Sequence, residues 1–218
     1  MKTAVRESMR IHTRLGPSAP LAPVVRQVVL LLNPASADVK RDLRDIQRMH
    51  ARTCSLVGAA RADAQLLWRA DGHRLVVQST RPIDLSRLPR GYASIHEERT
   101  VKLDWPAGTT VRWEIVANPT RDIPRTRRRV GLTNPEECAD WIQARLPRAG
   151  LRPLRIDGWQ EPLGRGWHPM GRIIVGRWRF RGVAIVEQPD ALAQALIHGI
   201  GKGKAYGVGL LTVEEVAS

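Results

Sequence analysis

The sequence predicts an α+β protein made of two tandem domains that share one order of elements. In each half of the 218 residues, the hydrophobic periodicity predicts a strand, a helix, two strands, a weaker or shorter helix and a last strand. The first strand of each half ends at an asparagine followed by proline, Asn33 in one half and Asn118 in the other. This order is ferredoxin-like, so we expect ferredoxin-like domains at residues 24–104 and 109–218.

The charge of the chain points to a polyanionic partner. Lys and Arg number 35 and Asp and Glu number 21, which leaves a formal net charge of +14. A basic surface of this size attracts nucleic acid. One alternative is a soluble basic protein without a nucleic-acid partner. Another is a ribosome- or DNA-associated protein, a hypothesis for which the net charge is the sole support.

Composition also excludes several classes of protein. No run reaches the roughly 18 apolar residues that a membrane span needs, so we expect no membrane partner. The two cysteines, Cys54 and Cys138, are too few for a disulfide framework or a cysteine-based zinc site, which favours a reducing, cytoplasmic setting. Residues 1–23 mix arginine with proline and glycine, and we expect them to form a disordered basic leader.

In the first domain, the apolar run at residues 24–32 predicts a buried strand. One helix should follow, capped by Ser36 or Asp38. Its apolar residues recur at helical spacing: Val39, Leu43, Ile46 and Met49. Residues 64–80 then predict a hairpin that turns at Asp71-Gly72. The proline-rich residues 81–94 are weakly helical at most, and residues 95–103 predict the closing strand.

In the second domain, a strand at residues 110–117 leads into a basic loop. Asn134 then caps a helix, with proline at the first helical position and Glu137 three residues after the cap. The remaining elements are predicted from their apolar patterns: strands at 151–159 and 172–186, a short helix at 189–198 and a last strand at 206–214.

A glycine-rich segment precedes the last strand. Five glycines fall within eleven residues, which lets the backbone approach a ligand closely: Gly199, Gly201, Gly203, Gly207 and Gly209. Lys202 and Lys204 add positive charge, so the segment suits a phosphate backbone. A dinucleotide site is excluded because a strand, and not a helix, follows the segment. The alternative is a glycine-rich turn with a purely structural role.

Four segments, in order along the chain, resemble one family. They are VVLLLNPAS with DLRDIQRMH, then VRWEIVANPTRD, then RRRVGLTNPEECADWIQARLPRAGLRPL, and finally GIGKGKAYGVGLLTV near the C-terminus. Together they resemble the type I-E CRISPR repeat endoribonucleases, which belong to the repeat-associated RNA-binding (RAMP) superfamily. The resemblance covers residues 24–218.

The resemblance implies two RAMP/RRM-like domains and cleavage of CRISPR precursor RNA at the base of the repeat hairpin. The implied reaction is attack of a ribose 2′-OH on the adjacent phosphate, which leaves a 2′,3′-cyclic phosphate and a 5′-OH. The implied reaction needs no metal and no cofactor, which fits the lack of an acidic cluster and of a histidine-based metal motif in the sequence. Implied partners are the repeat hairpin, retained as crRNA, and the other type I-E Cascade subunits, with a monomer in isolation.

The resemblance carries His50 over as the catalytic residue, and an ordinary imidazole pKa near 6.5 suits proton transfer. A lone histidine on a helix is otherwise more often structural. Some family members carry a catalytic tyrosine three residues earlier, where this chain has Gln47. Glutamine donates hydrogen bonds but transfers protons poorly, so Gln47 has at most a supporting role. It also keeps open a non-catalytic CRISPR RNA-binding subunit as the alternative.

Two groups of arginines are candidate RNA contacts. The first forms the basic loop of the second domain, where the family grips the RNA stem: Arg121, Arg125, Arg127, Arg128 and Arg129. A solvated loop is the alternative. The second group, Arg177 and Arg179 with Arg181, alternates along a predicted strand, so its members share one face. That face is either a second basic surface or the solvent side of the strand.

Overall fold

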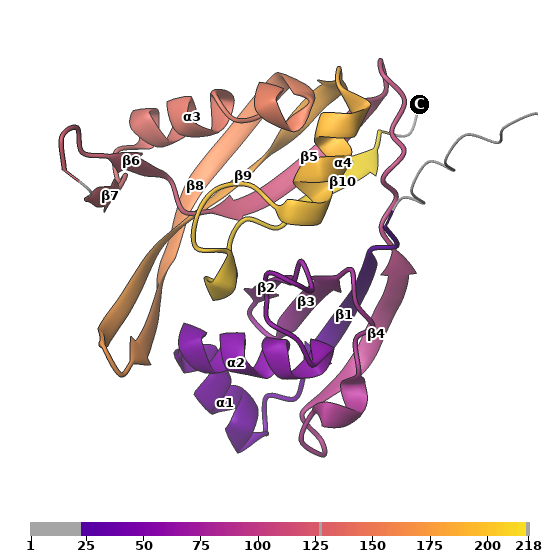
Figure 1. The fold of residues 1–218 in the computed structure, drawn as a ribbon, viewed down its shortest axis with the longest axis vertical. Coiled ribbons are helices and arrows are strands. Elements are labelled where there is room, and N and C mark those ends of the chain that lie inside the picture. Colours follow the sequence, from indigo (N-terminus) through magenta and orange to yellow (C-terminus); the bar gives the residue numbers. More distant parts are fainter. Residues whose placement is uncertain (1–22, 127, 217–218) are drawn as a thin grey trace, which may run out of the picture.

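The computed structural model describes residues 23–126 and 128–216. The predicted leader at residues 1–22, Arg127 and the last two residues lie outside the described part. The described chain forms two α+β domains, each with its own antiparallel sheet (Figure 1). The predicted fold class is therefore confirmed.

The N-terminal domain has a four-stranded sheet in the order β2-β3-β1-β4. This is the ferredoxin-like order, with the first and third strands in the centre. Its elements run β1 (Arg26–Leu32), α1 (Ala37–Arg44), α2 (Ile46–Val57), β2 (Leu67–Asp71), β3 (Arg74–Ser79), η1 (Leu85–Arg87) and β4 (Ala93–Thr100). Buried side chains such as Val28, Leu56 and Trp68 pack between the sheet and the helices.

The single helix predicted after β1 is wrong, because the chain breaks at Asp45 into α1 and α2. Asp45 is extended (φ −139°, ψ 106°), and its carboxylate accepts hydrogen bonds from the Gln47 N–H (2.9 Å) and the Arg48 N–H (3.4 Å). These bonds satisfy donors at the first turn of α2. Leu43 and His50 consequently lie on different helices and do not share one helical face.

The second helix of this domain is reduced to the 3₁₀ turn η1, as its proline content suggests. Pro82 and Pro89 flank this turn, and a proline cannot donate the backbone hydrogen bond that a helix interior needs. Strand β4 starts two residues before its predicted position and ends three residues early.

The C-terminal domain repeats the order in its sheet, β10-β5-β9-β8. Its elements are β5 (Thr110–Ala117), β6 (Thr120–Asp122), β7 (Arg129–Gly131), α3 (Pro135–Gln143), η2 (Pro147–Ala149), β8 (Leu151–His168), β9 (Gly171–Val186), α4 (Pro189–His198), η3 (Lys204–Tyr206) and β10 (Leu211–Glu215). Its core contains Trp113, Trp141 and Phe180. The predicted basic loop is the short antiparallel pair β6–β7 and its turn.

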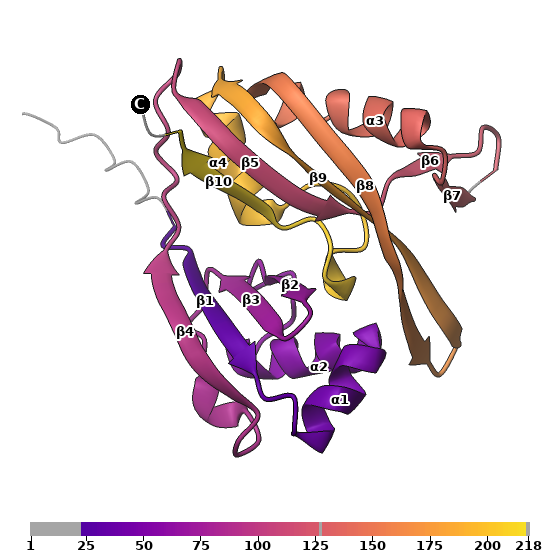
Figure 2. The same cartoon turned by 180° about the vertical axis from the view of Figure 1, so that it is seen from behind.

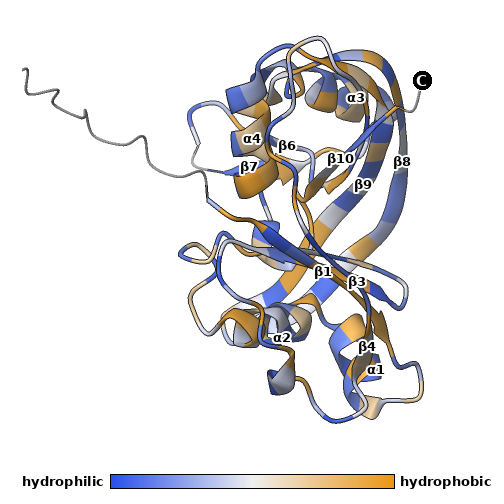
Figure 3. Ribbon diagram, turned by 90° about the vertical axis from the view of Figure 1, so that its right-hand side faces the viewer, coloured by the Kyte–Doolittle hydropathy of each residue, from blue (hydrophilic) through white to orange (hydrophobic). Residues whose placement is uncertain are grey.

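Strand β8 is twice as long as predicted, with 18 residues. It pairs with β9 in a hairpin that extends beyond the sheet and reaches the helices of the N-terminal domain (Figures 1 and 2). Hydrophilic residues recur along both strands (Figure 3), and Trp167 near the hairpin tip is 68% exposed. The last strand starts five residues later than predicted, at Leu211, after the turn η3 at residues 204–206 and four residues outside any strand.

Candidate active site

His50 lies one turn into α2, half-buried at the junction of the two domains. Its Nδ1 is 3.5 Å from the Sγ of Cys54, one turn further along the same helix. Burial raises the pKa of the Cys54 thiol, although nearby Arg61 acts in the opposite direction. The thiol and the imidazole are therefore within hydrogen-bonding range, and the tautomer of the ring sets which of the two donates.

Tyr206 approaches His50 from the other domain. The two rings meet edge to face, with centroids 6.1 Å apart and an interplanar angle of 69°. Tyr206 ends the turn η3, inside the glycine-rich segment, and the sequence analysis did not identify it as a site residue. The available signal was that only two tyrosines occur in the chain and one of them lies in this segment.

The glycine-rich segment reaches the N-terminal domain through Trp68. The indole N–H of Trp68 donates to the carbonyl of Ala205 at 3.1 Å. Gly207 lies directly over the same indole, because a Cβ there would be 2.5 Å from a ring carbon. These contacts hold η3 beside α2, so that His50 and Tyr206 come together.

All five predicted glycines have positive φ, between 69° and 92°, a region that favours glycine. Gly207 and Gly209 are buried, and their missing side chains make room for Trp68 and for the Ile200 carbonyl. Both therefore have a structural role in holding the loop, and RNA binding by these two stays a prediction. Gly199, Gly201 and Gly203 remain predicted contacts.

Cations gather around His50. Burial, and after it the charge of Arg61, lowers the pKa of His50 below its usual value. Burial and the charges of Arg61 and Lys202 likewise lower the pKa of Lys204. An imidazole with a lowered pKa is mostly neutral at physiological pH and can accept a proton. The cluster of His50, Arg61, Lys202 and Lys204 suits a phosphate group.

Gln47 lies one turn before His50 on α2, half-buried. The hairpin strand β8 covers this end of the helix: a Cβ at Gly166 would be 2.7 Å from the Asp45 Oδ1 and 3.0 Å from the Gln47 backbone nitrogen. The C-terminal domain therefore contacts α2 at two places, through β8 at its first turn and through η3 beside His50.

The basic loop lies beside α3, separated from α2 along the long axis of the molecule (Figures 1 and 2). Arg121 pairs with Glu137 at 2.8 Å and Arg129 with Asp122 at 2.7 Å. Arg125 and Arg128 are exposed, and within the described residues neither forms an ion pair. These two are the loop arginines most available to a phosphate backbone.

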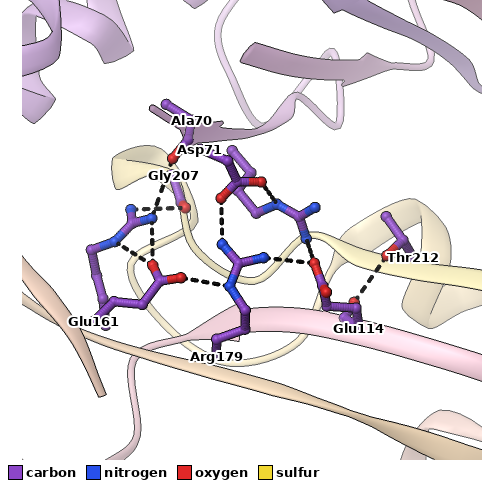
Figure 4. Close-up of polar contacts among 9 residues, drawn as sticks. Ala70, Asp71, Glu114, Glu161, Arg179, Gly207 and Thr212 are labelled. Carbon is purple, nitrogen blue, oxygen red and sulfur yellow. Dashed lines mark hydrogen bonds and ion pairs between the residues drawn. The ribbon is translucent and has the colours of Figure 1, made fainter. Parts of the chain in front are cut away.

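Arg177 and Arg179 do not form the predicted basic surface, nor do they lie on a solvent face. Arg179 contacts Glu161 (Nε–Oε1 2.5 Å), Glu114 (Nη1–Oε1 2.7 Å) and Asp71 (Figure 4). Arg177 pairs with Glu161 at 3.0 Å. The arginine side chains are only 11% and 14% exposed, so their RNA-binding assignment is corrected to a structural one.

Two further properties concern metals and membranes. Within the described part of the chain, no group of three His, Cys, Asp or Glu side chains is arranged to hold a metal ion. No helix there combines the length and the apolar character that crossing a bilayer requires.

The chain is similar to known CRISPR-associated proteins. A family model described as "CRISPR associated protein" matches residues 28–215. The chain is 30% identical over 204 residues to the CRISPR-associated endoribonuclease Cse3 of Thermus thermophilus, which covers 84% of this chain and 97% of that protein.

Solved structures give the same relationship. Thermus thermophilus Cse3 bound to an RNA that represents a pre-cleavage complex matches with a TM-score of 0.80 and 30% identity, over 88% of this chain and 99% of that one. A chain of a CRISPR RNA-guided surveillance complex matches with a TM-score of 0.69 and 26% identity, over 88% and 100%. This chain therefore belongs to the family of CRISPR-associated proteins, among the relatives of the endoribonuclease Cse3.

Proposed function

We propose that this protein is a metal-independent endoribonuclease that cuts CRISPR precursor RNA at the base of the repeat hairpin. The observation that carries the proposal is His50, a half-buried histidine with a lowered pKa, surrounded by cations where the two domains meet. The same fold holds RNA in the solved structure of the related Cse3.

The proposed reaction needs three things from the protein. One group takes the proton of the attacking 2′-OH, another protonates the departing 5′ oxygen, and positive charge stabilises the crowded phosphate between them. His50 is the group for proton transfer, and Arg61, Lys202 and Lys204 are the nearby positive charges. The products are a 2′,3′-cyclic phosphate and a 5′-OH, and no step requires a metal ion.

The basic surfaces account for binding of the hairpin and for its retention after cleavage. Arg125 and Arg128 beside α3 offer phosphate contacts outside the site of cleavage. We propose that these contacts keep the cleaved hairpin bound as crRNA, and that the protein acts in the cytoplasm as a subunit of a type I-E Cascade complex. The similarity to a chain of a surveillance complex supports this assembly.

A non-catalytic RNA-binding subunit is the second candidate, and Gln47 is the observation that favours it. Gln47 occupies the position at which some relatives of this family have a catalytic tyrosine. Membership of the CRISPR-associated family leaves no support for a ribosomal or DNA-associated protein, which net charge alone had suggested.

The test is single-turnover cleavage of a repeat hairpin by wild-type protein and His50→Ala, with His96→Ala as the matched control on an exposed strand position. We expect His50→Ala to bind within a few-fold of wild type and to cleave roughly 10²–10⁴-fold more slowly. Cleavage by wild type should persist in excess EDTA. A 2′-deoxy substitution just before the scissile phosphate should abolish it, because the nucleophile is then missing.

Two results would contradict the proposal. Loss of affinity in His50→Ala, in step with loss of cleavage, would make His50 a binding residue. Tight binding by the wild-type protein without any cleavage would establish the non-catalytic alternative.

A further inference from the structure

The two tyrosines of the chain have opposite environments. Tyr92 is buried, and its hydroxyl donates to the carboxylate of Asp42 at 2.9 Å. The hydroxyl of Tyr206 has no hydrogen-bond partner among the described residues, and it is not a buried atom. Tyr92 is therefore a structural residue, whereas Tyr206 offers a free phenol next to His50.

The position of Tyr206 is fixed by packing on both sides. Its backbone N–H donates to the carbonyl of Gly203 at 2.7 Å, and the preceding carbonyl accepts from Trp68. The next residue, Gly207, is held against the same indole. These contacts fix the backbone of Tyr206 and so place its ring beside His50 before a substrate binds, which is how catalytic groups are typically positioned.

We propose that Tyr206 is a catalytic residue, and that its phenol protonates the departing 5′ oxygen while His50 accepts the proton of the 2′-OH. This inference rests on the proposed function. As the bond from O2′ to phosphorus forms, the proton of O2′ passes to an imidazole nitrogen of His50. As the bond from phosphorus to O5′ breaks, O5′ takes the phenolic proton. Proton exchange with solvent then restores both groups.

The surroundings of the two groups favour this division. His50 faces Cys54 on its own helix and Tyr206 on η3, and the charge of Arg61, which follows the helix, acts on it. Burial and Arg61 keep the imidazole largely neutral, so it is a base at physiological pH. The hydroxyl of Tyr206 donates to no described residue, so its proton is available to the departing 5′ oxygen.

The arrangement also explains how the chain acts without a tyrosine on α2. Gln47 cannot supply a proton readily, but the second domain brings one phenol next to His50. The proton donor thus comes from the glycine-rich loop, and the histidine comes from the N-terminal domain.

The test uses Tyr206→Phe, which keeps the ring against His50 and removes only the hydroxyl. With the normal hairpin, we expect single-turnover cleavage roughly 10²-fold slower than wild type, with unchanged affinity and melting temperature. The second substrate carries sulfur in place of the 5′-bridging oxygen at the cut. A thiolate departs without a proton, so Tyr206→Phe should cut this substrate at close to the wild-type rate. His50→Ala should stay slow on it, because the 2′-OH still needs a base.

Each other outcome overturns the inference. Wild-type rates for Tyr206→Phe on the normal hairpin, with a slow His50→Ala, remove Tyr206 from catalysis and leave the proposed function standing. Equal slowing of Tyr206→Phe on both substrates excludes the acid role. Rescue of His50→Ala by the sulfur substrate reverses the two roles. A wild-type protein that cuts neither substrate overturns the inference and the proposed function together.

Discussion

Arg179 forms an ion pair with Asp71 across the boundary between the two domains. Asp71 ends β2 of the N-terminal sheet, and Arg179 lies on β9 of the C-terminal sheet, 108 positions later. The same guanidinium contacts Glu114 and Glu161, while Arg69 joins Asp71 to Glu114 (Figure 4). The pairs link both domains and the base of the long hairpin into one network.

Replacing Arg179 by methionine should destabilise the protein strongly. The variant leaves partly buried carboxylates without their shared cation, and breaking a buried pair in this way costs on the order of 3 kcal/mol. Urea unfolding measures the change. Arg181→Ala is the control, because this residue alternates with Arg179 on β9 but is exposed, and it should change stability by at most about 0.5 kcal/mol. Equally small losses of stability in the two variants would show that the network contributes nothing to the free energy of unfolding.

Replacing Gly207 by alanine should also destabilise the fold, for two reasons. The residue has a φ of 75°, and its new Cβ would lie 2.5 Å from the ring of Trp68. Gly91→Ala isolates the first reason, since Gly91 has a φ of 71° and open space around it. We expect a loss of about 1 kcal/mol for Gly91→Ala and about 1–3 kcal/mol more for Gly207→Ala, measured by urea unfolding.

Replacing Arg125 and Arg128 together by alanine should weaken hairpin binding and flatten its dependence on salt. Each lost phosphate contact reduces the slope of log K against log salt by somewhat less than about 1. The matched control is Arg90→Ala with Arg148→Ala, which removes the same charge from exposed positions elsewhere. Filter binding across a salt series measures both slopes. An identical slope for the two double variants would mean that the loop contributes only general charge.

Replacing Arg61 by glutamine should raise the pKa of His50. Arg61 is the smaller of the two causes that lower this pKa, so the value should rise but remain below about 6.5, because burial persists. NMR titration of the His50 ring proton measures the shift directly. In cleavage assays, the fall in rate toward acid pH should move to higher pH in this variant. An unmoved titration would show that Arg61 does not act on the imidazole.

The lowered pKa of His50 also makes stability depend on pH. The folded state binds a proton at His50 less readily than the unfolded state does. The stabilising contribution of the neutral imidazole to the free energy of unfolding is therefore fully present above the unfolded pKa near 6.5. It is lost as the pH falls from there toward the folded pKa. The difference in unfolding free energy between wild type and His50→Gln should therefore shrink over that acidic range. A difference that stays constant with pH would contradict the lowered pKa.

The sequence by itself determined the two ferredoxin-like domains, the strands at their centres and the helical conformation around His50. Hydrophobic periodicity and asparagine-proline ends are local signals, and they act through a few neighbouring residues. The sequence also marked the glycine-rich segment, whose residues need positive φ wherever the rest of the chain lies.

Only the tertiary structure decided which residues share the site and which serve the interface. The alternation of Arg177 and Arg179 shows that the two side chains share a face of the strand. In the folded protein, that face is covered by Asp71 and Glu161, which come from segments distant in the sequence. Tyr206 reaches His50 because the indole of Trp68 binds the carbonyl of Ala205, the residue before Tyr206. Trp68 and Ala205 are 137 positions apart in the chain. The length of β8 depends likewise on the helix α2 against which its end packs. Periodicity reports which side of an element is buried, whereas what buries it depends on contacts between segments that are far apart in the sequence.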